Sequence, residues 1–182
     1  MTLRTTTESD LLDHLRWHAD LSATAWIPER PRPQSLDQRK EWLKEVAKDQ
    51  GQIHFEITEG EAHVGYCSFG LLWPPTASSW TVRTLFVAPQ ARGRGIGRDA
   101  ALALHRFAID HHGLERGDVW LYRDDAAGRR LCESLGYVEY AHGHDVFYRE
   151  GRYWDGWRGA LEADEFRRRH PNEREYPERE TA

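Results

Sequence analysis

The spacing of apolar residues divides the chain into helical and extended segments. Leu12 and Leu15 begin an apolar stripe with helical spacing, which predicts a helix over residues 10–21. Ser35 and Gln38 form a capping-box pattern in front of a second stripe, so a second helix is expected from residue 36. The chain therefore opens with two helices before any strand pattern appears.

Alternating apolar and polar positions then indicate strands. The pattern predicts strands and helices in the order strand 52–58, strand 62–72, strand 80–87, helix 100–108, strand 118–122, helix 126–136, and a closing meander of segments 137–141, 145–150 and 152–161. The first three strands can pair antiparallel through short connections. The strand–helix–strand unit from residue 80 to 122 requires a right-handed crossover and a parallel pair. The order predicts a mixed α/β sandwich around one sheet.

Length and charge limit the kinds of protein that this can be. The 182 residues fit one domain, which we expect to span 1–161, and the charged, proline-containing residues 162–182 predict a helix end followed by a disordered tail. The formal net charge of −5 argues against a nucleic-acid partner. The chain has no long apolar run and no signal peptide, and its two cysteines are isolated. These features predict a cytoplasmic protein without a membrane partner. We expect a monomer or a homodimer.

A glycine-rich loop, "RGRGIG" at residues 92–97, lies between the strand at 80–87 and the following helix. Backbone N–H groups at a helix start have no helical partners, and the glycines Gly93, Gly95 and Gly97 let an anion approach them closely. Positive charge is added by Arg92, Arg94 and Arg98. The loop predicts a phosphate or pyrophosphate site. It lacks the Gly-Lys-Ser/Thr of a Walker A loop, and its third glycine comes one position early for a dinucleotide fingerprint.

The segment "VAPQARGRGIGRDA" resembles the acetyl-coenzyme A signature of the GNAT superfamily of N-acetyltransferases, in which Gln90, Gly93 and Gly95 fill Arg/Gln-x-x-Gly-x-Gly/Ala. Downstream, "DAAGRRLCESLGYVE" is similar to a second family segment, with Asp125 at its Asn position. The resemblance covers residues 3–161, and its closing part is similar to the branch of ribosomal-protein and small-amine acetyltransferases. It implies a mostly antiparallel mixed sheet with a splayed parallel strand pair, flanked by helices. It also implies acetyl-coenzyme A as acyl donor and the primary amine of a small molecule or peptide as acceptor.

The resemblance also implies where the cofactor lies. The pantetheine arm would enter between the splayed strands, the Val87 N–H would bind the thioester carbonyl, and the loop backbone would hold the pyrophosphate. The cofactor-binding residues implied in this way are Leu85, Phe86, Val87, Arg92, Gly93, Arg94, Gly95, Ile96, Gly97, Arg98 and Asp125.

Two positions depart from the family pattern. Arg83 stands where many members have a glutamate base, and it could instead bind a carboxylate or phosphate of the acceptor, unless a one-residue bulge turns it out of the cleft. Cys132 stands at the family's tyrosine acid, and it is either the proton donor or a packing residue, with Tyr122 and Tyr137 as weaker substitutes for the acid. For the base we expect Glu56, with His54, His63, a water chain or an amine that arrives neutral left open.

Two aromatic residues beside proline-containing loops, Trp26 and Trp73, are expected to border the acceptor site. We expect no metal site, because the pairs His14/His18 and His142/His144 are interpreted as surface histidines. The main hypothesis is an acetyl-coenzyme A-dependent N-acetyltransferase. The alternatives are a catalytically silent acyl-coenzyme A sensor and, less compatible with the glycine spacing, a dinucleotide oxidoreductase.

Overall fold

The computed structural model describes residues 1–27, 34–72 and 78–171. Its strands are β1 (Thr2–Arg4), β2 (Gln52–Glu59), β3 (Ala62–Leu71), β4 (Ser79–Val87), β5 (Arg116–Tyr122), β6 (Val138–Arg149) and β7 (Arg152–Glu162). Its α-helices are α1 (Leu11–Ala19), α2 (Leu36–Lys48), α3 (Ile96–Arg106), α4 (Ala126–Leu135) and α5 (Ala163–Arg169). The predicted capping box is present. Ser35 Oγ accepts a hydrogen bond from Gln38 N, and Ser35 N donates one to Gln38 Oε1.

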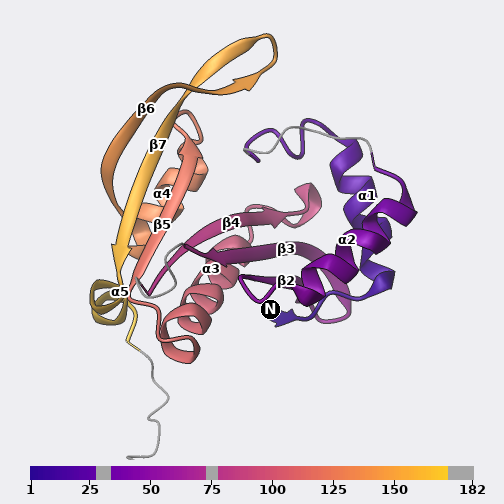
Figure 1. Ribbon diagram of the computed structural model, residues 1–182, viewed down its shortest axis with the longest axis horizontal. Coiled ribbons are helices and arrows are strands. Elements are labelled where there is room, and N and C mark those ends of the chain that lie inside the picture. The colour runs from indigo at the N-terminus through magenta and orange to yellow at the C-terminus, as the bar shows by residue number, and fades with distance from the viewer. Residues whose placement is uncertain (28–33, 73–77, 172–182) are drawn as a thin grey trace, which may run out of the picture.

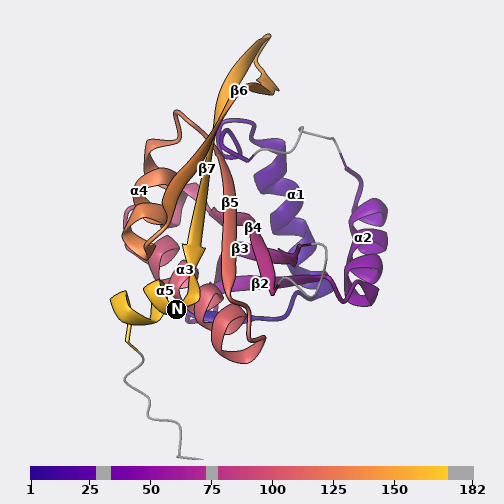
Figure 2. The same ribbon diagram turned by 60° about the vertical axis from the view of Figure 1, so that its left-hand side comes forward.

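The strands of the described residues form one sheet in the order β1-β2-β3-β4-β5-β7-β6. Every neighbouring pair is antiparallel except β4 and β5, which are parallel and are joined by the crossover through α3. The expected mixed sheet with one parallel pair is therefore confirmed. Helices α1 and α2 cover one face, and α3, α4 and α5 lie on the other, as the edge-on view in Figure 2 shows.

Two apolar cores lie on the α3 side of the sheet. One joins β2, β3 and β4 to α3 around Phe69, Trp80 and Leu104. The other joins β5 and β7 to α3, α4 and α5 around Val119 and Trp157. Helix α3 thus contributes to both cores and links the two halves of the sheet.

The end of the chain differs from the prediction in how its strands are divided. The segments 137–141 and 145–150 belong to one long strand, β6, whose pairing with β7 is interrupted by irregularities between Glu139 and Ala141 and between Gly143 and Phe147. With β7 it forms the hairpin that projects from the body in Figure 1. The charged segment after residue 161 begins with α5, whose Phe166 is 1% exposed in the second core. Its charges lie on the outer face of the helix, so composition hid its packing; residues 172–182 lie outside the described part.

A buried polar network fixes α1 and α2 to the sheet. Glu56 of β2 is 1% exposed; its Oε1 accepts from Thr6 Oγ1 at 2.6 Å, and its Oε2 lies 2.9 Å from His14 Nε2 and 2.7 Å from His63 Nε2. Arg39 of α2 hydrogen-bonds to His14 Nδ1. Because a guanidinium only donates, His14 accepts at Nδ1 and donates from Nε2 to Glu56.

His63 holds the positive charge that balances this network. Its Nδ1 faces Asp13 Oδ2 at 3.0 Å while its Nε2 faces Glu56, so both ring nitrogens must donate. Burial opposes a charge on His63, but the hydrogen bond to Glu56 and the nearby carboxylates outweigh it and raise its pKa above 6.5. Burial likewise opposes the charge on Glu56, yet the hydrogen bonds from His14 and His63 lower its pKa to about 2.

Both cysteines of the chain are buried and free, and none of the helices in the described ranges is long and apolar enough to span a bilayer. The sheet is mostly antiparallel, unlike the parallel sheet that a dinucleotide-binding fold would have.

We predict that His63→Gln destabilises the fold by about 1.5–3 kcal/mol at pH 5.5, because charge-assisted hydrogen bonds to Asp13 and Glu56 are lost. Because the pKa of His63 is higher in the folded protein than its unfolded value of 6.5, its protonation stabilises the fold fully at pH values below 6.5. This stabilisation is lost as the pH rises through the folded-state pKa. The difference from wild type should therefore shrink by pH 8.5 in urea-unfolding titrations.

His144→Gln is the matched control, since His144 also has a raised pKa but a side chain that is 82% exposed. It should change stability far less. A destabilisation by His63→Gln that is the same at both pH values would show that His63 acts by packing alone.

Candidate active site

The central feature of the site is the separation of the parallel strands. Strands β4 and β5 pair only at Ser79–Arg116, Trp80–Gly117 and Thr81–Asp118. Beyond Thr81, β4 continues along β3 and β5 continues along β7, so the two strands part. The opening is a cavity of about 420 Å³ between the two halves of the sheet.

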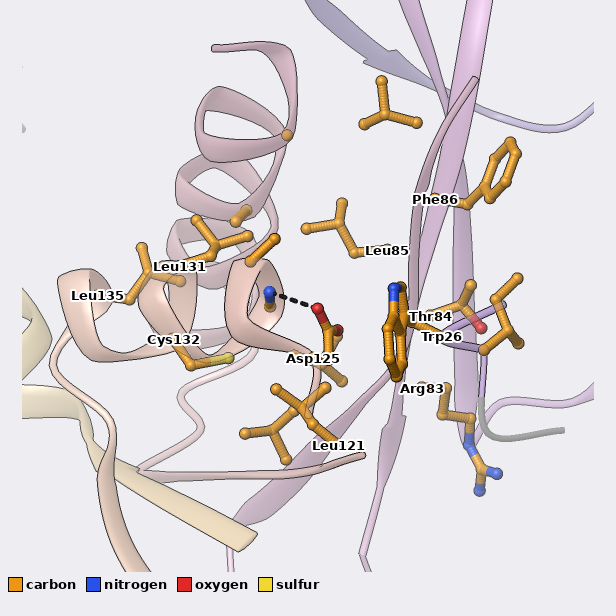
Figure 3. Close-up of a pocket in the computed structure, with 18 of the residues that line it drawn as sticks. Trp26, Arg83, Thr84, Leu85, Phe86, Leu121, Asp125, Leu131, Cys132 and Leu135 are labelled. Atoms are coloured by element: carbon orange, nitrogen blue, oxygen red, sulfur yellow. Dashed lines mark hydrogen bonds between the residues drawn. The ribbon is translucent and has the colours of Figure 1, made fainter. Parts of the chain in front are cut away.

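The walls of this cavity are mainly aliphatic. The stretch from Val82 to Val87 forms one wall, Val119–Leu121 forms the other, and the α4 residues Leu131 and Leu135 close the far side. Figure 3 shows Leu85, Leu121 and Leu131 directed into the same space. Of the predicted cofactor residues, Leu85, Phe86, Val87, Arg92, Gly97 and Asp125 line it.

The free edge of β4 offers backbone donors to this space. Ala88 N donates to Val64 O on β3, at 2.9 Å. Since successive N–H groups of a strand point to opposite sides, the Val87 N–H points away from β3, toward the cleft. This orientation supports the donor role expected of Val87.

The glycine loop leads directly into α3. Gly93 and Gly95 have φ of 75° and 83°, in the left-handed region, and Gly95 is the N-cap of α3. A Cβ at either position would have nothing within 4 Å, so the space above the loop is open. Backbone bonding of the helix begins with Arg98 N and Asp99 N, which both donate to Gly95 O. The preceding N–H groups of the loop remain available for an anion.

The loop side chains are used differently from one another. Arg92 donates from Nε to Val87 O at 2.8 Å and from Nη2 to Ala23 O at 2.7 Å, so it ties the segment after α1 to the end of β4. Arg94 pairs with Glu59 at 2.6 Å on the exposed surface. Ile96 points into the core and is 4% exposed, so it can offer a ligand only its backbone. Arg98 is exposed on the first turn of α3.

Asp125 and Cys132 face the cavity from α4 (Figure 3). Asp125 is the N-cap of α4 and accepts a hydrogen bond from Gly128 N at 2.8 Å. Burial, followed by the charges of Asp125 and Glu133, raises the pKa of the Cys132 thiol to about 12. The thiol is thus held neutral and is a weaker acid than an ordinary thiol of pKa about 8.5.

The cavity contains a pair of residues formed by His105, which the sequence analysis missed, and Tyr137, which it expected only as a weaker substitute for the acid. His105 and Tyr137 both line the cavity, and His105 Nε2 lies 2.9 Å from the Tyr137 hydroxyl. His105 Nδ1 donates to Ala101 O at 2.7 Å, so Nε2 accepts from Tyr137. Burial lowers the pKa of His105 to about 4 and raises that of Tyr137. A histidine inside the apolar stripe of the predicted helix was the available signal.

Glu56, the expected base, lines a second cavity on the α1 and α2 side rather than the main cleft. Both of its oxygens are occupied by Thr6, His14 and His63, and its pKa of about 2 makes it a poor proton acceptor. Its geometry is that of a structural carboxylate. His63 is held as its charged partner.

Arg83 is the extra residue of a β-bulge. The register of β3 with β4 passes from Ser68–Thr84 to Phe69–Val82, which leaves Arg83 unpaired. Its side chain lies against Gly70 of β3, where the position of a Cβ would be 2.5 Å from Arg83 Nε. In Figure 3 the guanidinium points away from Asp125 and Cys132. Arg83 thus borders both cavities and faces the second one.

Trp26 borders the main cleft from the segment after α1. Its ring meets Tyr122 and Trp154 edge-on, at centroid distances of 5.8 and 6.2 Å. Arg149 of the β6–β7 hairpin donates to the carbonyls of Leu21, Thr24 and Ala25 and so holds this segment. Trp73, the other expected acceptor residue, lies outside the described residues.

Two groups in the described ranges bring metal-ligand side chains together: His14, Glu56 and His63, and His142, His144 and Asp155. In each group an arginine donates to the second nitrogen of one histidine, Arg39 to His14 and Arg123 to His142. A metal-bound histidine must itself donate from that nitrogen. Both arrangements therefore fit hydrogen-bond networks better than metal sites.

Comparisons with known proteins agree with this geometry. The model of the acetyltransferase (GNAT) domain matches residues 1–138. No curated protein sequence matches the chain.

Solved structures share the fold. Spermidine N-acetyltransferase from Vibrio cholerae, in complex with CoA and spermine, superimposes with a TM-score of 0.83 at 19% identity, over 91% of this chain and 96% of that one. Ribosomal-protein-alanine N-acetyltransferase from Brucella melitensis superimposes with a TM-score of 0.77 at 25% identity, over 89% of this chain and 99% of that one. The family match spans about three quarters of the sequence, and the chain belongs to the GNAT acetyltransferase domain family.

Proposed function

We propose that this protein transfers an acetyl group from acetyl-coenzyme A directly to a primary amine of a small molecule or peptide. The observation that carries the proposal is the continuity of the aliphatic cleft between β4 and β5 with the open glycine loop at the start of α3. The cleft suits an extended, mostly apolar arm, and the loop suits a pyrophosphate. Both lie in one path along the surface of α3.

The residues present fit this donor. The open space above Gly93 and Gly95 leaves their N–H groups accessible to phosphate oxygens, with Arg98 exposed on the next turn. Bound acetyl-coenzyme A would supply an activated thioester. The Val87 N–H, fixed by the pairing of β4 with β3, would hold the carbonyl oxygen on which negative charge develops.

Deprotonation of the acceptor does not fall to a charged side chain of the cleft. Among the described residues that line it, His105 is committed to Ala101 and Tyr137, and Asp125 caps α4. Arg83 is always a cation. We therefore propose that the acceptor amine reaches the cleft in its neutral form, and that Trp26 provides an apolar wall beside it.

The second candidate is a silent acyl-coenzyme A sensor. It is supported by the same observations: an arginine replaces the usual base, and the Cys132 thiol, with a pKa of about 12, is a weak acid. Release of free coenzyme A with a panel of amines distinguishes the two functions. A protein that binds acetyl-coenzyme A but turns over none of the amines would be the sensor.

Gly95→Glu should lower the affinity for acetyl-coenzyme A by at least about 100-fold in calorimetry, because a carboxylate would enter the pyrophosphate site. Gly151→Glu is the matched control, since Gly151 has a similar φ of 79° and open surroundings at the tip of the β6–β7 hairpin. The control introduces the same side chain and the same backbone strain at a position away from the proposed cofactor site. Equal affinities of the two variants would remove the glycine loop from the cofactor site.

Cys132→Ala should lower kcat by about 3- to 10-fold without changing the affinity for acetyl-coenzyme A, which corresponds to the loss of one hydrogen bond of about 1 kcal/mol. A thiol with a pKa of about 12 can donate such a bond to the leaving sulfur. Cys132→Ser should restore most of the turnover, because a hydroxyl also donates. Full turnover in the alanine variant would make Cys132 a packing residue.

The pH dependence of kcat/KM should follow the acceptor rather than the enzyme. With two acceptors whose amine pKa values differ by about two units, the rising limb should move by a similar amount, because the neutral amine is the reactive species. If the midpoint of the rising limb instead stays at the same pH, below 6.5, for both acceptors, a side chain of the enzyme acts as the base. His54 would be the first residue to test, because burial lowers its pKa and its Nε2 has no partner.

A further inference from the structure

The second cavity, which we call the polar pocket, lies beside the cleft on the α1 and α2 side of the sheet. It measures about 110 Å³, room for roughly three or four groups of the size of water. Arg83 and Thr84 line both spaces, so the pocket and the cleft share a wall at the bulge of β4. The rest of its wall includes His18, Arg39, His54, Glu56, Tyr66 and Ser68.

The carboxylate of the polar pocket and one of its histidines are already occupied. Glu56 receives Thr6, His14 and His63, and the positive charge of His63 balances it. His18 Nε2 lies 2.9 Å from the Tyr66 hydroxyl, and burial followed by the charge of Arg39 lowers the pKa of His18 to about 4. Neither residue is left to bind a cation.

The groups without a partner among the described residues are donors. His54 Nε2 is buried and has no hydrogen bond, and it can carry the proton of a neutral imidazole. The guanidinium of Arg83 has no carboxylate partner in the described ranges, and the hydroxyls of Ser68 and Thr84 add two further donors. Arg39 on the opposite wall adds positive charge. A pocket that offers donors and positive charge is completed by an acceptor-rich anion.

We propose that the polar pocket binds a carboxylate of the acceptor, so that the preferred substrates are amino acids or other small amines with a carboxylate close to the amine. This proposal rests on the acetyl-transfer function and names its substrate class. The planar fork of Arg83 suits a carboxylate, and the shared wall at Arg83 and Thr84 leaves only a few atoms between this group and an amine in the cleft. A long polycation is disfavoured, because its further charges would meet Arg83 and Arg39.

The test compares each amino acid with the amine that remains after its carboxylate is removed: alanine with ethylamine, phenylalanine with phenethylamine, and lysine with cadaverine. Acetyl-coenzyme A is the donor, and kcat/KM is measured for each and expressed per concentration of neutral amine, so that differences in amine pKa do not enter the ratio. Wild type should favour each amino acid by at least 10-fold. The ratio should fall to below about 3-fold in Arg83→Gln.

Two further variants separate position from charge. Gly70→Ala keeps the charge of Arg83 but displaces its guanidinium from β3, because a Cβ would lie 2.5 Å from Nε, and it should lower the ratio as well. Arg168→Gln removes an equal charge from α5, where Arg168 is 71% exposed and pairs with Glu165, and it should leave the ratio unchanged.

The outcomes distinguish the two levels of the proposal. Turnover of the decarboxylated amines at a kcat/KM equal to or higher than that of the amino acids would overturn the carboxylate pocket and leave acetyl transfer intact. Release of coenzyme A with none of the amines would overturn acetyl transfer itself. An unchanged ratio in both Arg83→Gln and Gly70→Ala would also overturn the role of the polar pocket.

Discussion

The parting of β4 and β5 after three residue pairs determines the rest of the site. A parallel pair that stayed in register would bury its backbone groups in hydrogen bonds and leave no space for a ligand. Here each strand is held by its outer neighbour, β4 by β3 and β5 by β7, while α3 packs under both halves. The outer strands therefore keep β4 and β5 apart, and the free edge of β4 can offer backbone donors while its other edge stays paired with β3.

Two arginines, Arg92 and Arg149, hold the segment after α1 in place beside the cleft. Arg92 ties the segment after α1 to Val87, and Arg149 ties the same segment to the β6–β7 hairpin. These bonds place Trp26 over the cleft although it belongs to a loop. Four hydrogen bonds from these two arginines to carbonyls of the segment, each from a charged donor, hold it in place.

The proposed acceptor side has an unusual distribution of charge for a site that would handle amines. Its carboxylate, Glu56, is bound within the network that anchors α1 and α2, and its histidines His18 and His54 have lowered pKa values. Arg83 and Arg39 remain as cations on the wall of the polar pocket. This balance is the basis for both proposals: an amine that arrives neutral, and a carboxylate that accompanies it.

Local sequence patterns were enough to give the order of elements, the antiparallel start of the sheet, the crossover through α3 and the glycine loop at the start of this helix. These features depend on local periodicity, capping and glycine placement, which neighbouring residues specify. Tertiary structure alone decided the roles of particular side chains. Glu56 became a structural carboxylate because His14 and His63 converge on it from other elements, and Arg83 faced the polar pocket because a bulge shifted β4 by one residue. The burial of His105 and Phe166 likewise depends on partners distant in the chain, which no local pattern encodes.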